Sequence, residues 1–170
     1  MADVKGKQTL AGTWGELWIG GEKVFELKKI EAKITANRSD VQLGIDVDSK
    51  VTGLKGELTI GVYKVYTRGY DTLRSLAAGN DERMQIIANL ADPDAVGKQE
   101  ERYSIDNCWL NDLPLIGWEK GQPIEQEFTG GFTPSDMINL DRINFYIETF
   151  FRFFTNPYPA SHHFFFFFFF

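Results

Sequence analysis

The sequence is poor in the side chains on which catalysis and metal binding most often depend. It contains one cysteine, Cys108, and two histidines, His162 and His163, among 170 residues. One thiol cannot form an intrachain disulfide, which fits the reducing conditions of a cytoplasm. Residues 1–143 contain no histidine, so neither a Ser-His-Asp nor a Cys-His arrangement can form there. We therefore expect no enzymatic activity.

Two short stretches partly match known metal- or nucleotide-binding motifs, but each lacks required residues. Asp46-Val47-Asp48 is similar to the start of a calcium loop, but Lys50 stands where the next ligand is needed. Gly97-Lys98 is similar to the end of a P-loop, but Asp92 replaces the required glycine and Gln99 replaces the Ser or Thr. These mismatches predict a protein that binds no metal and no cofactor.

Long apolar runs and basic clusters are also missing. The longest apolar run, Phe164–Phe170, is much shorter than the roughly 20 residues that span a bilayer, so we expect no membrane insertion. Because Met1–Gln8 is polar and has no apolar stretch, we expect no secretory signal there. The net charge is −6, from 18 basic and 24 acidic residues, and no Lys/Arg cluster favours tight nucleic-acid binding. A mildly acidic surface would repel DNA.

Phenylalanine is distributed very unevenly. Of the 15 phenylalanines only Phe25, Phe128 and Phe132 precede residue 143. The whole net charge lies in residues 1–143, since residues 144–170 contain only Arg152 and Glu148. We expect residues 1–143 to form one domain and residues 144–170 to be an anomalous Phe-rich tail outside the fold. The tail is either a docking or membrane-surface segment or sequence translated beyond the natural stop.

The first half of the domain has hairpin signals. Gly20-Gly21 separates Thr13–Ile19 from Val24–Ala36, which predicts a two-residue turn between two strands. Along the second arm the apolar residues change parity at Lys28-Lys29, as a β-bulge requires. The polar stretch Asn37–Lys50 is interpreted as a long loop or an extended hairpin arm.

The second half adds further strands and one helix. Apolar residues at helical spacing predict a helix over Gly69–Ala78, and Thr133–Asp136 predicts a helical turn. Alternation and turn residues predict a strand from Leu54 to near Thr67 and further strands over Arg83–Ala91, Glu101–Leu110, Leu115–Trp118 and Ile124–Phe132. The sum is a mainly β fold: an antiparallel sandwich or barrel of about seven strands, with one packed α-helix and a long loop.

The order of these features resembles a known family. Leu10–Ile19, Gly20-Gly21 and Phe25–Ala36 are followed by Gly56–Ile60, Val62–Val65, Gln85–Ala91 and Glu125–Thr133. This series resembles the tail tube proteins of contractile phage tails, in particular the core tail proteins of PBSX-type prophages. The resemblance covers about residues 8–140. The tail from Asn144 onward has no counterpart in it.

The resemblance implies a structural subunit that forms hexameric rings around a channel, with rings stacked into a tube. The implied partners are further copies of the chain, the tail sheath protein, the baseplate or initiator proteins and the tape measure protein. DNA would pass without specific binding. The implied location is a virion tail or phage-tail-like particle assembled in the cytoplasm of a bacterial host; whether the particle carries DNA stays open.

Two groups of residues are the candidate sites. The long 37–50 segment resembles the family's extended loop, which reaches neighbouring subunits or the next ring. Its contact candidates are Arg38, Asp40, Val41, Leu43, Ile45, Asp46, Asp48 and Lys50. An acidic channel wall would suit DNA transit because like charges repel. The lumen candidates, chosen for their strand parity, are Glu26, Glu31, Glu57, Glu125 and Glu127.

Two alternatives remain. Exposed aromatic residues could make a β-barrel module that binds carbohydrates or oligonucleotides by stacking. The candidates are Trp14, Trp18, Tyr63, Tyr66, Tyr103, Trp109 and Trp118. Because no basic residues accompany them, core and interface packing is the better explanation. A hydrolase built on carboxylates alone is the other alternative, and no cleft signature supports it.

Overall fold

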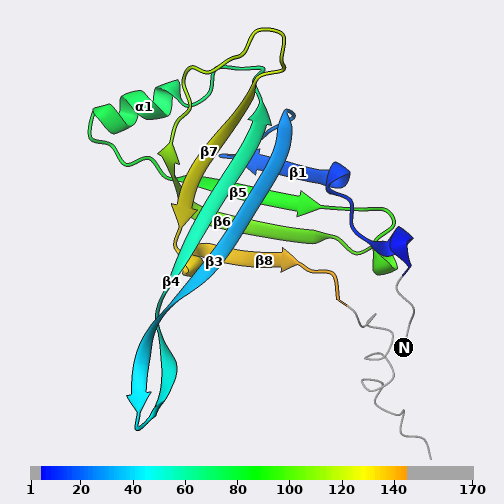
Figure 1. The fold of residues 1–170 in the computed structure, drawn as a ribbon. Helices are drawn as coiled ribbons and strands as arrows, with labels where there is room; N and C mark the ends of the chain where they lie inside the picture. Colours follow the sequence, from blue (N-terminus) through cyan, green and yellow to red (C-terminus); the bar gives the residue numbers. More distant parts are fainter. Residues whose placement is uncertain (1–4, 145–170) are drawn as a thin grey trace, which may run out of the picture.

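The protein folds as one antiparallel β-sheet that turns back across itself. The computed structural model describes residues 5–144 (Figure 1). Eight strands lie in the order β2-β1-β5-β6-β7-β4-β3, with β8 paired to β6. Their bounds are β1 Gly15–Ile19, β2 Glu22–Lys23, β3 Leu27–Leu43, β4 Asp46–Tyr63, β5 Met84–Leu90, β6 Glu101–Asp112, β7 Glu125–Phe132 and β8 Met137–Asp141. The predicted mainly β, antiparallel class is confirmed.

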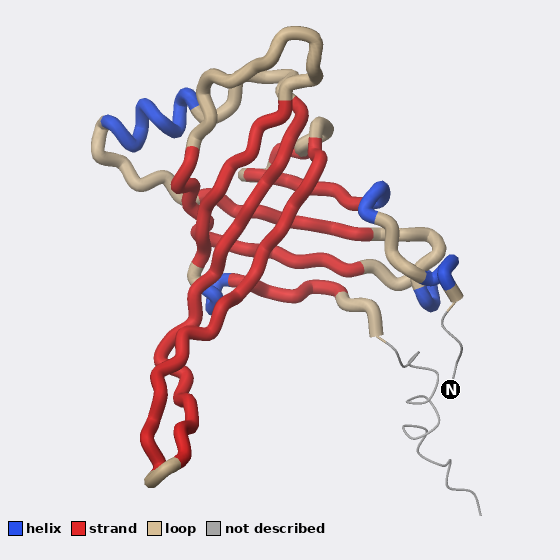
Figure 2. The backbone as a smooth tube through the Cα atoms, in the orientation of Figure 1, coloured by secondary structure: helices blue, strands red, loops and turns tan. Residues whose placement is uncertain are grey.

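The sheet forms two layers that cross at a steep angle (Figure 2). The layer that we call the arm layer contains β3, β4, β7 and the end of β6, whereas β1, β2, β5, β8 and the start of β6 form the second layer. β6 changes layers at a bulge, where Asp106 and Asn107 lie opposite one residue of β5. Asn107 has a φ of 54°, a left-handed conformation that asparagine tolerates. Such bulges let one strand take part in both sheets.

The apolar side chains of both layers meet in one core. Cys108 is 0% exposed there and packs as a small apolar residue. Burial, followed by the charges of Asp106 and Asp136, raises the pKa of Cys108 to about 11, so the thiol stays protonated at neutral pH. The core contains Leu17, Val24, Leu58, Ile60, Val62, Ile86, Ile105, Cys108, Phe128 and Phe132.

The Gly-Gly hairpin forms, but its second arm is divided. Gly20 and Gly21 have φ values of 57° and 87°, as a type I′ turn requires, and they join β1 to β2. The predicted arm Val24–Ala36 was wrong as one strand, because β2 ends at Lys23 and the chain then crosses to the other layer. There β3 pairs with β4, and Lys28 is the extra residue of the predicted bulge.

The 37–50 segment is an extended hairpin arm and not a loop. The β3–β4 ladder continues to the pair Leu43 and Asp46, and only Gly44-Ile45 lies in the turn. Gly44 has a φ of 68° at the first turn position, where glycine is favoured. The outer part of this hairpin projects beyond the rest of the molecule (Figure 1).

Three local predictions differ from the structure. No strand forms over Leu115–Trp118, where Pro114 and Gly117 interrupt the segment. Strand β8 was not predicted. The predicted helix is present as α1, Tyr70–Ala77, but it buries no residue and is therefore not packed into the core. The turn after Thr133 is confirmed as a 3-10 helix over Pro134–Asp136.

Among residues 5–144 no helix has the length and apolar character needed to cross a membrane. The Phe-rich tail after Asn144, which was predicted to lie outside the fold, falls outside the described residues.

Candidate assembly surfaces

The projecting hairpin exposes apolar side chains that nothing in the domain covers. Every residue from 31 to 52 is exposed, including Ile45 at 97% and Leu43 at 58%. Paired residues share a face, so Val41 and Leu43 lie with Asp46 and Asp48 on one face of the hairpin. We call residues 37–53 the arm. Contiguous exposed apolar residues of this kind mark surfaces that bind another protein.

The arm brings the eight predicted contact residues together. Five of them, Val41, Leu43, Asp46, Asp48 and Lys50, share one face, Arg38 and Asp40 lie on the other, and Ile45 is in the turn. Sequence reasoning missed Val47 and Val51, which are exposed on the face of Arg38 and Asp40. The alternation of apolar and charged residues through 41–48 was the signal for Val47.

A bulge separates the arm from the domain. Asn37 pairs with Gly53 and Arg38 pairs with Val51, which leaves Thr52 as the extra residue. The Thr52 hydroxyl donates to the Asn37 carbonyl oxygen at 3.2 Å. Bulges bend a strand and increase its twist, so this residue sets the direction of the arm relative to the arm layer.

Strand β3 is a long free edge. It is the last strand in the sheet order and contains 17 residues. Among residues 5–144 it pairs with β4 alone, so its other side presents unpaired backbone donors and acceptors. A long exposed edge is a template for pairing with another chain.

The outer face of the arm layer collects four of the five predicted lumen carboxylates. Glu31 and Glu57 lie on the outward parity of β3 and β4, and Glu125 and Glu127 on that of β7. Lys29 Nζ lies 2.9 Å from Glu31, and Glu57 accepts from Lys33 at 2.9 Å and Lys55 at 3.0 Å. Lys28 pairs with Glu125. These four glutamates and four lysines make a balanced face and not a purely acidic one.

The lysine contacts change the titration of this face. The hydrogen bond from Lys29, followed by its charge, lowers the pKa of Glu31 below its usual value. Hydrogen bonds from Lys33 and Lys55 lower the pKa of Glu57 in the same way. Both carboxylates are therefore ionised at neutral pH, each beside its cation.

Glu26 has a different environment from the other four. Its side chain is 5% exposed, and Arg68 lies 2.6 Å from one carboxylate oxygen. Burial alone would raise the pKa of Glu26, but the Arg68 hydrogen bond, backbone donors and the Arg68 charge together lower it. Glu26 thus anchors the segment after β4, and its carboxylate is not available to line a channel.

A shallow hollow of about 460 Å³ lies on the charged face beside Trp109. A Cβ on Gly131 would lie 2.8 Å from the Trp109 ring, so the strand needs glycine for the ring to lie flat on it. The Arg83 guanidinium stacks on Trp109 with its carbon 4.5 Å from the ring centre. These contacts on both sides hold the Trp109 ring in place at the edge of the hollow.

The aromatic residues considered for ligand stacking do not come from one strand or loop. Trp14 and Trp18 belong to the start of the domain, Tyr103 and Trp109 to β6, and Trp118 to the 113–124 loop. Lys28, Lys23, Arg68 and Arg83 already contact the rings of Tyr63, Trp18, Tyr66 and Trp109. This distribution does not favour a single platform for bases or sugars.

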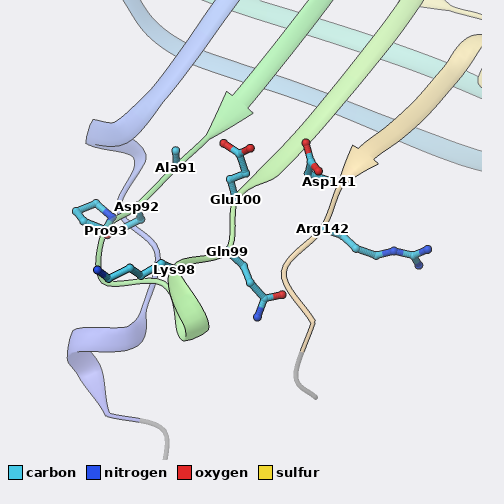
Figure 3. Close-up of a pocket in the computed structure, with 8 residues that line it drawn as sticks. All are labelled: Ala91, Asp92, Pro93, Lys98, Gln99, Glu100, Asp141 and Arg142. Atoms are coloured by element: carbon cyan, nitrogen blue, oxygen red, sulfur yellow. The ribbon is translucent and has the colours of Figure 1, made fainter. Parts of the chain in front are cut away.

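A second hollow, of about 370 Å³, lies where the turn after β5 meets the end of β8 (Figure 3). Glu100, just before β6, and Asp141, at the end of β8, line it, while Arg142 points away from Lys98. Asp92 beside it accepts from the backbone N–H groups of Ala11 at 2.7 Å and Asp94 at 2.8 Å. Asp92 therefore holds the N-terminal segment against the domain.

Within residues 5–144 no three His, Cys, Asp or Glu side chains are grouped to hold a metal ion.

A free 17-residue edge and a projecting arm with exposed apolar residues are typical of a structural β-protein that associates with other chains. The sequence profile of the family described as "Phage tail tube protein" matches residues 2–139. The chain belongs to this family. It is a structural component of a phage tail or tail-like particle and not an enzyme.

Individual relatives agree with this assignment. Over 138 residues the chain is 25% identical to "Uncharacterized protein YqbM" of Bacillus subtilis (strain 168), covering 79% of this chain and 93% of the relative. The fold is similar to the PVC sheath/tube terminator of an extracellular contractile injection system, with a TM-score of 0.61 and 14% identity over 77% of this chain and 96% of that one.

Two further structures have the same fold. The tube terminating cap of the anti-feeding prophage has a TM-score of 0.61 and 13% identity, covering 84% of this chain and 100% of that one. A subunit of the PVC sheath-tube complex in the extended state has a TM-score of 0.58 and 11% identity, covering 82% and 100%. At such identities the likeness shows the fold.

Proposed function

We propose that the chain is the repeating subunit of the inner tube of a contractile phage tail or phage-tail-like particle. Six copies close into a ring, and the rings stack around a channel. The observation that carries this proposal is the arm layer, a four-stranded sheet with the 17-residue strand β3 as a free edge. Head-to-tail contacts between identical chains close into rings when the rotation permits it.

The other side of the arm layer offers the complementary edge. Residues Trp109–Asp112 of β6 pair with β7, and within residues 5–144 they have no ladder partner on their other side. A neighbouring copy's β3 placed there would continue the arm layer from subunit to subunit. Pairing of this kind removes the exposed edge that would make a monomer prone to aggregation.

The charged face of the arm layer is the proposed channel wall, with Glu31, Glu57, Glu125 and Glu127 as its carboxylates. Each of the first three has a lysine partner, so the wall has charges of both signs at short spacing. Fields from closely paired charges cancel within a few ångströms, and salt screens what remains. DNA in transit would therefore meet no strong attraction.

The expected partners are those of a tube. The arm and the edges contact neighbouring copies, and the sheath and the baseplate or initiator proteins contact the finished tube. Similarity to subunits of a sheath-tube complex and of an anti-feeding prophage baseplate, at TM-scores of 0.58 and 0.51, supports these two partners. The tape measure protein and DNA would lie in the channel. Residues 1–143 form the domain that assembles.

Electron microscopy and mass measurement test the proposal. Purified protein, with and without baseplate proteins as nucleators, should give hollow rings or tubes, and the smallest ring should have the mass of six chains. Hydrogen exchange should show β3 amides slowed by assembly, while the amides of residues 56–62 of β4, paired on both sides in the monomer, serve as the control. A protein that stays monomeric at high concentration with the baseplate present would refute the proposal.

A further inference from the structure

A second exposed apolar surface lies at the end of the domain where β4 stops. Ile116 and Trp118 of the 113–124 loop are 81% and 70% exposed, and Val65 and Tyr66 after β4 are exposed beside them. The two segments are joined, since the Lys64 N–H donates to the Ile124 carbonyl at 2.9 Å. We call residues 63–68 and 113–124 the rim.

The rim and the arm lie at opposite ends of the molecule. Strand β4 begins at Asp46 in the arm tip and ends at Tyr63 in the rim, a span of 18 residues. At about 3.3 Å per residue, the two ends are separated by roughly 55 Å. Figure 1 shows the 113–124 loop at the top of the molecule and the arm tip at the bottom. A single copy therefore cannot bring its own arm to its own rim.

The two surfaces are complementary in charge as well as apolar. Residues 41–48, the arm tip, contain Asp46 and Asp48 and no basic residue. The rim contains three basic residues, Lys64, Arg68 and Lys120, and one acidic residue, Glu119. Arg68 is already paired with Glu26, so Lys64 is the more available cation for a partner's carboxylate. Opposite charges around an apolar contact steer association and fix its register.

We propose that the arm tip of one copy docks on the rim of a second copy in the next ring. This inference rests on the proposed tube function and names the surface that receives the arm. The arm and the rim are different surfaces at opposite ends of the molecule. Each copy can therefore dock its arm on one neighbour and receive the arm of another, so rings can be added without limit. Contact between two arm tips would instead be symmetrical and would stop at two rings.

Chemical cross-linking tests the contact directly. Ile45→Cys and Ile116→Cys chains, one carrying an affinity tag, are co-assembled and treated with a flexible bis-maleimide; Cys108, at 0% exposure, should not react. The expected product is a covalent dimer of the two variants. Asp94→Cys, on a turn at neither surface, replaces Ile116→Cys in the control pair, which should give no dimer above background.

Charge reversal gives an independent test. Asp46→Lys with Asp48→Lys should leave six-chain rings intact but reduce tube length about tenfold, and Lys64→Glu with Lys120→Glu in the same chain should restore it. Glu22→Lys is the control for charge alone. The docking proposal would be overturned if tubes co-assembled from the two cysteine variants gave no dimer between positions 45 and 116, or if the Ile45→Cys chain cross-linked only to itself. Charge reversal without effect on tube length would overturn it as well. Failure of the wild type to form rings would overturn the tube function instead.

Discussion

The glycines of β7 are needed because two strands approach each other closely at Trp109. A Cβ on Gly130 would lie 2.1 Å from the Trp109 carbonyl oxygen, a backbone atom that cannot rotate away. We expect Gly130→Ala to lower the free energy of unfolding by about 2–3 kcal/mol, measured by denaturant titration. Gly53→Ala is the matched control, because nothing lies within 4 Å of its Cβ position and its cost should be small. Equal effects of the two changes would contradict this explanation.

The Glu26–Arg68 pair is the most buried ion pair of the domain as described. Arg68→Met leaves a carboxylate that is 5% exposed without its cation, and one oxygen, Oε2, already has no partner. We expect a loss of about 2 kcal/mol, less than for a fully buried pair because Arg68 is a third exposed. Glu26→Gln combined with Arg68→Met should cost less than Arg68→Met alone, which a thermal melt of each variant would show.

The same pair predicts the pH dependence of stability. The pKa of Glu26 is lower in the folded than in the unfolded chain, so the ionised form favours folding. The contribution is complete above the ordinary carboxylate range and is lost as the pH falls through the folded pKa. The difference in unfolding free energy between wild type and Glu26→Gln should therefore shrink on acidification. A difference that grows towards acid pH would show the opposite sign.

Single positions were predicted well where strand parity decides them. The change of parity at Lys28-Lys29 located the bulge, and the alternation around Phe128 placed Glu125 and Glu127 on the outer face. Glu26 shows the limit of that reasoning. It lies between β2 and β3, where the chain crosses from one layer to the other, and its partner Arg68 is 42 positions away. Parity cannot locate a tertiary partner.

The arm is an independent element whose removal should not disturb the core. Residues 41–48 are all exposed, and Asp40 pairs directly with Ser49. Replacing Val41–Asp48 by Asn-Gly would close the shortened hairpin in register, since Asn-Gly favours a two-residue turn. We expect an unchanged unfolding midpoint and the loss of tube growth in electron micrographs.

A matched variant separates the side chains of the arm from its length. Val41→Thr, Leu43→Thr and Ile45→Thr keep the hairpin and its β propensity but remove exposed apolar surface. This variant should also fail to form long tubes. Normal tubes from either variant would contradict the role assigned to the arm.

Local signals predicted elements well only where a strand stays in one sheet. Gly20-Gly21 and the Gly69–Ala78 helix pattern were sufficient because turn chemistry and helical spacing act locally. The prediction of one strand over Val24–Ala36 was wrong because the chain crosses between the layers at residues 24–26, before the change of parity at Lys28-Lys29. Strand β8 was missed since Ile138 and Leu140 alternate over only five residues and remain half-exposed. Its position depends on β6, far earlier in the chain.

The layer crossing, the arm and the free edge together decide what the whole molecule can do. The sequence predicted where the strands lie and which acidic side chains point outward. It could not show that these carboxylates would lie beside lysines. Glu57 illustrates this, because Lys33 comes from β3 and Lys55 lies two residues away on β4. The face that was expected to be acidic therefore has a lysine beside most of its carboxylates, so its positive and negative charges are balanced.

The extent of the assembling domain leads to the last prediction. The family profile ends at residue 139, β8 ends at Asp141, and Gln99 exchanges hydrogen bonds of 2.9 and 3.2 Å with the backbone of Asn144. We therefore expect a chain ending at Asn144 to unfold at the same denaturant concentration as the full chain and to form the same rings. Denaturant titration and mass measurement would check both.

Truncation after Asp136 is the matched control, because it removes β8 and its ladder with Arg102–Ile105 of β6. The truncation removes Met137, which packs against the core, and leaves four residues of β6 without a partner strand on one side. The shorter chain should therefore unfold at lower denaturant or fail to fold. If the chain ending at Asn144 lost its rings while keeping its stability, the Phe-rich segment would be a docking element required for assembly. That result would refute the 1–143 boundary while leaving the fold unchanged.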